Sequence, residues 1–238
     1  MEQLKEKLKH LSGGRILDVC TGFGGFVKQL KDSFGSYDKI IGIDQSEEYI
    51  EKAEKEIKDD NIRFEAMNAE DLQFADSSFD TVSISNSLHH LKNPDKVLNE
   101  MTRVLKKGGL FIICEIIFDK ELETENSHHH IHHWWAEVDR LNNITHNKTI
   151  SRKNVFELAS KLNLKELDSF EHIGDAWTAN DEDMEKIGWL VTKCDEYINK
   201  VKDNPTNDEL VQRGEKLKEI LSTTGCTLDP LMYILGRK

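Results

Sequence analysis

No stretch of this sequence approaches the roughly 18 unbroken apolar residues that a membrane-spanning helix needs. The start of the chain, MEQLKEKLKH, also lacks the apolar centre of a secretion signal. These two absences argue against a membrane span and predict a cytoplasmic protein.

Paired cysteines and long basic runs are missing as well. The cysteines stand singly, with no C-x-x-C pair, which argues against a disulfide framework and against a thiolate zinc site. The formal net charge is −12 at pH 7, and no long Lys/Arg run offsets it. Because this charge repels phosphate backbones, we expect no nucleic-acid partner and favour a small molecule or a protein.

What the sequence does contain is an alternation of short β-branched runs with longer segments of helical period, which is typical of a parallel sheet covered by helices. Five strands are predicted at 15–19, 39–43, 61–67, 79–85 and 109–116, with helices between them at 23–34, 46–58 and 94–106. Asn93-Pro94 is a good start for the third helix, and Gly108-Gly109 is a good stop.

The second half of the chain predicts two helical additions to this pattern. A helical stretch rich in His and Trp covers about 126–142, a helix follows at 151–162, and strands are expected at 164–173 and 227–238. Between those last strands an apolar seam indicates a helix, formed by Met184, Ile187, Val191, Cys194, Ile198 and Val201. After a break at Asn204-Pro205, a second amphipathic helix carries Leu210, Leu217 and Leu221.

The predicted fold is therefore a single α/β domain over 1–238: a Rossmann-like, doubly wound seven-stranded sheet, mostly parallel with an antiparallel last strand. The core covers about 13–117 and 150–238. Helical lid additions at about 120–146 and 180–222 lie near the C-terminal ends of the strands, where they cover a site or pair two copies of the chain as a homodimer.

The stretch LDVCTGFGGF, residues 17–26, indicates a cofactor loop between a strand and a helix. A dinucleotide-binding loop needs G-x-G-x-x-G, but Gly22 and Gly24 are followed by Val27 where the third glycine belongs. Asp18 would also repel a pyrophosphate. A cationic ligand without phosphate, such as S-adenosylmethionine, fits the loop better.

Four segments in the correct order resemble the successive motifs of class I S-adenosylmethionine-dependent methyltransferases, and they span roughly residues 13 to 117. They are LDVCTGFGGF, IIGIDQS, NAEDLQF and FDTVSISNSLHHLKNPDKVLNEMTRVLKKGGLFIICE. The branch that they resemble most contains the ubiquinone and menaquinone biosynthesis methyltransferases. The resemblance implies S-adenosylmethionine as cofactor, S-adenosylhomocysteine as product and a small-molecule acceptor.

The resemblance also implies roles for individual residues. The methionine part of the cofactor would face Asp18, Cys20, Gly22 and Gly24, and the ribose hydroxyls would bond to Asp44. The adenine would lie beside Gln45, Ser46, Asn68 and Ala69, and the methyl group near Ser85 and Asn86. Asn68 stands where many relatives have Asp. Structural alternatives are a tight turn for the glycines, a helix cap for Asp44 and a surface turn for Asn68.

The acceptor side is predicted from Glu115 and from the segment HHHIHHWW. Glu115 closes the fifth strand, where it contacts substrate or faces solvent. On a helix His129, His133 and Glu137 lie in one row with the spacing of a metal site, while His132, Trp135 and Asp139 share a neighbouring face. The alternatives are a solvated helix whose Trp134 and Trp135 pack on the core, or a wall of the acceptor pocket formed by His129, His133 and Trp134. No metal is favoured, although one is compatible with the row.

Methyl transfer requires the alignment of nucleophile, methyl carbon and sulfur, and a base if the acceptor is a hydroxyl. His90, His133 and His146 are candidate bases, since an unperturbed imidazole has a pKa of about 6.5. His89 is expected to pack against a neighbouring loop. Two other functions stay open: a catalytically silent cofactor-binding or interaction module, and, third, a dinucleotide-dependent oxidoreductase. The sequence does not identify the acceptor.

Overall fold

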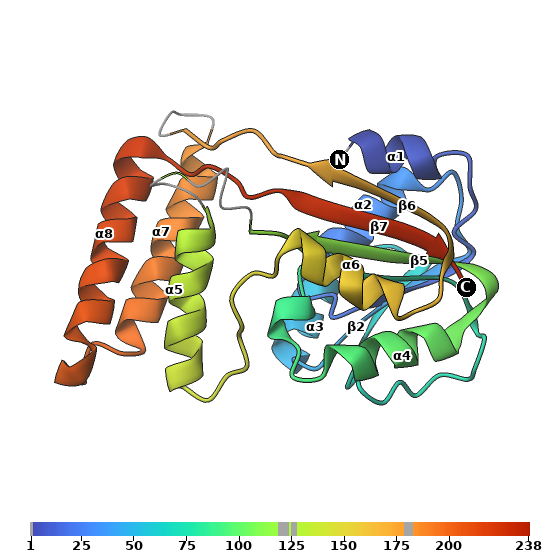
Figure 1. The fold of residues 1–238 in the computed structure, drawn as a ribbon, viewed down its shortest axis with the longest axis horizontal. Helices are drawn as coiled ribbons and strands as arrows, with labels where there is room; N and C mark the ends of the chain where they lie inside the picture. Colours follow the sequence, from blue (N-terminus) through green and yellow to red (C-terminus); the bar gives the residue numbers. More distant parts are fainter. Residues whose placement is uncertain (1, 119–123, 125–127, 179–182) are drawn as a thin grey trace.

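The computed structural model describes residues 2–118, 124, 128–178 and 183–238, and it contains one seven-stranded sheet in the order β3-β2-β1-β4-β5-β7-β6 (Figure 1). The strands are β1 (Arg15–Val19), β2 (Lys39–Asp44), β3 (Ile62–Ala66), β4 (Phe79–Ser85), β5 (Leu105–Ile116), β6 (Lys165–His172) and β7 (Leu231–Arg237). Only β7 pairs antiparallel with its neighbours β5 and β6. The predicted fold class is confirmed.

Helices cover both faces of the sheet. Alternating strand residues feed two separate apolar layers: Leu17 and Val19 of β1 belong to one, and Ile16 to the other. The first layer is closed by α4 (Pro94–Val104) and α6 (Arg152–Ser160). The second is closed by α1 (Glu2–Leu8), α2 (Gly25–Ser33) and α3 (Glu47–Glu56).

The sequence did not predict α1, which buries Leu4 and Leu8 completely. The predicted stop of α4 at Gly108-Gly109 was also wrong. The helix ends at Val104, and β5 begins at once, because Leu105 pairs with Phe79 before the register shifts. The two glycines lie inside that irregular start of the strand.

Helices α5 (His128–Leu141), α7 (Met184–Asn199) and α8 (Asp208–Thr224) pack together beside the sheet, and we call them the bundle (Figure 1). The sequence presented them as two separate additions. In the structure they share their own apolar core, which includes Trp134, Leu190 and Leu221. The parallel strands point toward the bundle, so it lies at their carboxyl ends (Figure 1).

The seam on α7 is only partly as predicted. Ile187, Cys194 and Ile198 are buried, but Met184 is 52% exposed and Leu190 occupies the bundle core instead. None of the described helices combines the length and the apolar character needed to cross a membrane. Pairing of two copies through the helical additions stays a prediction.

Candidate functional site

The carboxyl ends of β1, β2 and β4 meet at one edge of the sheet. Val19 is in register with Ile43 on one side and with Ile84 on the other, so the loops that follow these strands are neighbours. Open α/β sheets bind ligands at this edge. The predicted cofactor residues from the first, second and fourth motifs are thereby brought together.

The glycine loop after β1 has the backbone that its glycines allow. Gly22 and Gly24 have φ of 54° and 78°, in the left-handed region that glycine adopts without strain. A Cβ on Gly24 would lie 2.6 Å from Ile57 Cδ1, so this glycine is needed for packing. A Cβ on Gly22 would have no atom within 4 Å. The backbone of Gly22 is therefore open to a ligand.

Asp44 links the glycine loop to the loop after β2. Its Oδ2 accepts a hydrogen bond from Gly22 N at 3.0 Å, and its Oδ1 accepts one from Ser46 N at 3.0 Å. Ser46 in turn caps α3 by accepting from Tyr49 N at 3.3 Å, and Gln45 is exposed. Asp44 is half-buried, so its carboxylate keeps a face for further donors while it holds the two loops together.

Asp18 is more enclosed than the sequence indicated. It is 1% exposed, and its two carboxylate oxygens accept from Thr21 Oγ1 and Ser83 Oγ, both at 2.7 Å. Burial raises the pKa of Asp18 to about 6, and the two hydroxyls oppose that rise. The residue therefore holds the glycine loop onto β1 and β4. Cys20 beside it has φ of 56°, which is unusual for a residue with a side chain.

The adenine-side residues lie in the loop after β3. Asn68 is exposed, and its Oδ1 accepts from Glu70 N at 2.9 Å, which is the surface turn that the sequence offered as the alternative. Ala69 is buried beneath it. The amide oxygen of Asn68 has a second lone pair, so the turn leaves an acceptor available.

Glu115 does not face solvent, which corrects one of the two alternatives for this residue, while its contact with substrate stays a prediction. It is completely buried, and one carboxylate oxygen accepts from Ser87 N at 3.2 Å and Leu88 N at 2.8 Å. The other accepts from Ile116 N at 3.0 Å and lies 2.9 Å from His89 Nδ1. Glu115 thus organises the loop after β4 from inside the protein.

This loop carries the residues expected near the transferred methyl group. Ser85 ends β4, and Asn86 is exposed with φ of 46° while its N–H donates to Cys114 O at 2.8 Å. The 3₁₀ helix η1 (Leu88–His90) follows immediately. His89 points inward and His90 is exposed, so the two histidines of LHH lie in different environments.

The three side chains of the predicted row on α5 each bond to a residue outside the row. His129 Nδ1 lies 2.9 Å from Asp229 Oδ1, His133 Nε2 lies 2.9 Å from Thr149 Oγ1, and Glu137 forms an ion pair with Arg213 at 2.6 Å. Burial is the main cause that lowers the pKa of His133 to about 4. His129, His133 and Glu137 therefore do not form together the metal site with which their spacing is compatible.

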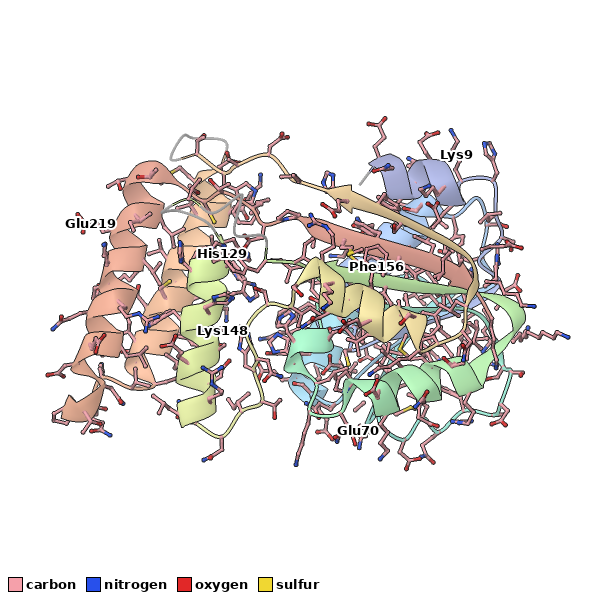
Figure 2. All side chains as sticks on the ribbon, in the orientation of Figure 1. Lys9, Glu70, His129, Lys148, Phe156 and Glu219 are labelled. Atoms are coloured by element: carbon pink, nitrogen blue, oxygen red, sulfur yellow. The ribbon has the colours of Figure 1, made fainter. Side chains whose placement is uncertain are left out.

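Trp134 lies in an apolar core, as one of the two alternatives for the HHHIHHWW segment predicted. It is completely buried in the bundle core, and its indole Nε1 donates to Leu210 O at 2.9 Å. Trp135 lies in the same core. Trp134 consequently packs the core of the bundle, and its contact with an acceptor stays a prediction. Figure 2 shows His129 on α5, while Glu219 lies on the outer side of α8.

A different group of side chains comes together between the sheet edge and the bundle. His146, which follows α5, has its Nδ1 2.8 Å from Asp139 Oδ2 and its ring 4.2 Å from that of His90. The rings of His89 and His132 lie 5.6 Å apart. The sequence had placed His132 and Asp139 on one helix face, which was the only local signal for this group.

The fold, the glycine loop after β1 and the acidic residue after β2 define the class of Rossmann-like proteins that bind a nucleoside-bearing cofactor at the carboxyl edge of the sheet. Within this class, residues 10–224 match the family model described as a methyltransferase domain. The chain belongs to that family.

Relatives in two comparisons agree with this assignment. The chain is 38% identical over 113 residues to the demethylmenaquinone methyltransferase of Lactococcus lactis, covering 46% of this chain and 45% of the relative. It is 35% identical over 114 residues to the ubiquinone/menaquinone biosynthesis C-methyltransferase of Geotalea daltonii, covering 46% and 48%. The chain thus spans about half the length of the curated relatives that it matches.

A solved structure shows the same fold over the whole chain. It is the phosphoethanolamine N-methyltransferase 2 of Haemonchus contortus in complex with S-adenosyl-L-methionine, with a TM-score of 0.58 and 18% identity, covering 100% of this chain and 51% of that one. At this identity the likeness establishes the fold alone.

Proposed function

We propose that this protein transfers a methyl group from S-adenosylmethionine to a small-molecule acceptor. The observation that carries the proposal is the position of Asp44. Its carboxylate stands at the end of β2, bonded to the glycine loop and half-open to solvent. A carboxylate there suits two adjacent ribose hydroxyls, which both donate to it.

The residues around Asp44 fit such a cofactor. Gly22 leaves space above the loop, and Asp18 supplies negative charge beneath it. The cofactor would supply a methyl group activated on a sulfonium. The residues that would hold it are Asp18, Cys20, Gly22, Gly24, Asp44, Gln45, Ser46, Asn68, Ala69, Ser85 and Asn86.

The protein's own task is to align the acceptor and to keep water out, because the sulfur leaves as a neutral thioether and needs no acid. The acceptor would enter between the carboxyl edge of the sheet and α5, where η1 and His146 lie. The names of the curated relatives favour an aromatic ring of the hydroquinone type as acceptor.

Among the three candidate bases, His90 is best placed to meet an acceptor. His133 is bonded to Thr149 and its pKa is lowered to about 4, mainly by burial, so it is a weak base. His146 is bonded to Asp139 and is 3% exposed. His90 is exposed on the loop that follows Asn86. Desolvation of its ring, and then the neighbouring His89 and His146, lower its pKa to about 3, so His90 too is a weak base and its role is to contact the acceptor. We assign the contact with the acceptor to His90.

The variant His90→Gln is expected to lower kcat by roughly tenfold, because it removes a side chain that aligns the acceptor. Its dissociation constant for S-adenosylmethionine is expected to stay within about twofold, because His90 lies on the acceptor side. Steady-state kinetics and calorimetry measure the two quantities. A change confined to the cofactor dissociation constant would place His90 at the cofactor instead.

Turnover tests the proposal itself. The full chain is incubated with methyl-labelled S-adenosylmethionine and a panel of acceptors that contains a demethylated hydroquinone, a simple phenol and a catechol. We expect label in the hydroquinone product. Cofactor binding without transfer to any acceptor would favour the silent binding module, and hydride exchange with NADH would favour the oxidoreductase.

A further inference from the structure

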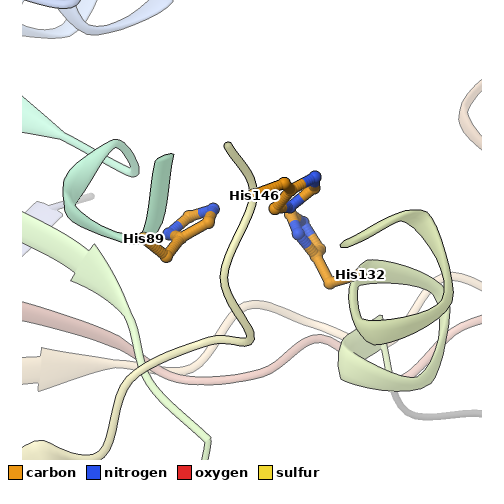
Figure 3. A group of neighbouring side chains, drawn as sticks. All are labelled: His89, His132 and His146. Carbon is orange, nitrogen blue, oxygen red and sulfur yellow. The ribbon is translucent and has the colours of Figure 1, made fainter. Parts of the chain in front are cut away.

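Three histidines from separate parts of the chain converge between the sheet edge and the bundle (Figure 3). His89 lies on η1, His132 on α5 and His146 in the segment that follows α5. One ring nitrogen from each comes within 4.8 Å of the other two. Figure 3 shows the three rings turned toward one another.

Each ring keeps a nitrogen that the rest of the described chain does not use. His89 Nε2, His132 Nδ1 and His146 Nε2 are buried and have no hydrogen-bond partner among the described residues. His89 and His146 are only 1% and 3% exposed. A buried ring nitrogen without a partner has lost its hydrogen bond to water and gained none in exchange, which destabilises the folded chain. Three such groups in one place indicate a missing common partner.

The opposite nitrogens of two rings are fixed by buried carboxylates. His89 Nδ1 lies 2.9 Å from Glu115 Oε1, and His146 Nδ1 lies 2.8 Å from Asp139 Oδ2. A carboxylate on Nδ1 holds the proton there and leaves the Nε2 lone pair free. This arrangement of carboxylate, histidine and free nitrogen is the one that orients histidines toward a metal ion.

We propose that His89, His132 and His146 bind one divalent transition-metal ion. Imidazole nitrogen is a ligand that Zn²⁺ and its neighbours in the first transition row accept readily. Tetrahedral zinc with Zn–N of about 2.0–2.1 Å separates its ligand nitrogens by roughly 3.3 Å. The three nitrogens therefore need to approach by at most about 1.5 Å, which small rotations of the rings and a shift of the His146 segment supply.

The surrounding charges suit a cation. Glu115 and Asp139 lie directly behind two of the ligands, and Asp139 also accepts from Tyr197 Oη at 2.8 Å. Lys200 Nζ, 3.2 Å from Asp139 Oδ1, offsets part of this negative charge. Other ring neighbours are the imidazole of His90, at 4.2 Å from His146, and the rings of His128 and Trp135, at 4.5 Å and 5.3 Å from His132.

Three protein ligands leave a fourth position on a tetrahedral ion, as in catalytic rather than structural zinc sites. His89 follows Asn86 by three residues, so this position is at the edge of the sheet where the proposed function places the acceptor. Resting on that proposed function, the ion would take a hydroxyl oxygen of the acceptor and lower the pKa of that hydroxyl. The binding of metal does not depend on methyl transfer.

Calorimetric titration of the chelator-treated full chain with Zn²⁺ tests the site. We expect one tight site per chain, a rise in Tm with Zn²⁺, and visible absorption typical of tetrahedral coordination when Co²⁺ replaces Zn²⁺. His132→Ala and His146→Ala are each expected to weaken this site at least a hundredfold. Asp139→Asn, which removes only the support behind His146, is expected to weaken it about ten- to hundredfold.

Two control variants separate this site from other histidines. His133→Ala removes a histidine adjacent to His132 on the same helix, and His10→Ala removes an exposed one on the distant end of the core. Both are expected to bind Zn²⁺ as the wild type does. If His146→Ala fails to fold, the Zn²⁺ affinity of His132→Ala and the Co²⁺ spectrum of the wild type decide whether the site binds metal.

Absence of a tight Zn²⁺ site in the wild type would overturn the proposal. So would a site that survives His132→Ala and His146→Ala, or one that is lost in His133→Ala. If zinc binds as expected while no acceptor is methylated, the metal site stands and the proposed function fails. If methyl transfer proceeds in the presence of chelator and no tight metal site is found, the proposed function stands and the metal site fails.

Discussion

Replacing Asp44 with alanine is expected to raise the dissociation constant for S-adenosylmethionine by roughly ten- to hundredfold, since a hydrogen bond to a charged group contributes about 1.5–3 kcal/mol. The substitution removes the acceptor for the ribose hydroxyls and also frees the N–H groups of Gly22 and Ser46. These donors lie at a half-open edge and can turn to water, so the fold is expected to persist. Calorimetric titration measures the loss.

Glu47→Ala is the matched control for this variant. Glu47 is an exposed carboxylate in the first turn of α3, three residues from Asp44, and its removal changes the net charge by the same amount. The affinity of the Glu47→Ala variant for S-adenosylmethionine is expected to equal that of the wild type. An unchanged dissociation constant in Asp44→Ala would leave Asp44 as a link between two loops and move the ribose elsewhere.

Replacing Glu115 with alanine is expected to lower the free energy of unfolding by about 3–5 kcal/mol, the range for breaking a buried charged network from one side. Three backbone N–H groups and His89 Nδ1 would lose their acceptor in a place that water does not reach. Urea unfolding in the presence of chelator measures this effect, and chelation keeps bound metal from contributing.

Glu115→Gln keeps the shape and one oxygen of the side chain, so we expect it to lose clearly less stability than the alanine variant. Glu51→Ala, on the exposed side of α3, is expected to stay within about 0.5 kcal/mol of the wild type, as surface substitutions do. If Glu115→Ala were as stable as Glu51→Ala, the hydrogen bonds of Glu115 around η1 would not contribute to the free energy of unfolding.

The loops that form the proposed cofactor site could be predicted because their signals are local. A strand, two glycines and a helix follow one another within LDVCTGFGGF, and Asp44 directly ends the next strand. The parallel order of the strands then brings these ends to one edge. The pairing of α7 with α8 follows from two helical periods separated by the break at Asn204-Pro205, whereas the alternation of periods does not set the antiparallel direction of β7.

The rest depended on contacts between distant residues. Glu115 ends an apolar strand and gives no sign that Ser87 N, Leu88 N and His89 Nδ1 from the loop after β4 will surround it. His129, His133 and Glu137 have ideal helical spacing for a row, but each of these side chains bonds to another partner: Asp229, Thr149 and Arg213, respectively. His89, His132 and His146 meet only because the bundle packs against the sheet edge.

The errors in the predicted secondary structure also arise from contacts between distant residues. A glycine pair after a helix commonly stops it, but here the sheet pairing of Leu105 with Phe79 ends α4 earlier. On α7 the apolar periodicity is compatible with a buried side chain at Met184 and at Leu190. The packing of α5 and α8 selected Leu190 and left Met184 exposed.

Titration of the full chain with S-adenosylmethionine, S-adenosylhomocysteine and NAD is the most direct test of the central claim that this edge of the sheet holds a sulfonium cofactor. We expect both adenosyl compounds to bind at one site per chain and NAD to show no measurable binding. The reason is that Asp18 lies under the loop and that Val27, completely buried, stands where a dinucleotide loop needs its third glycine. Binding of NAD without binding of S-adenosylmethionine would contradict the account.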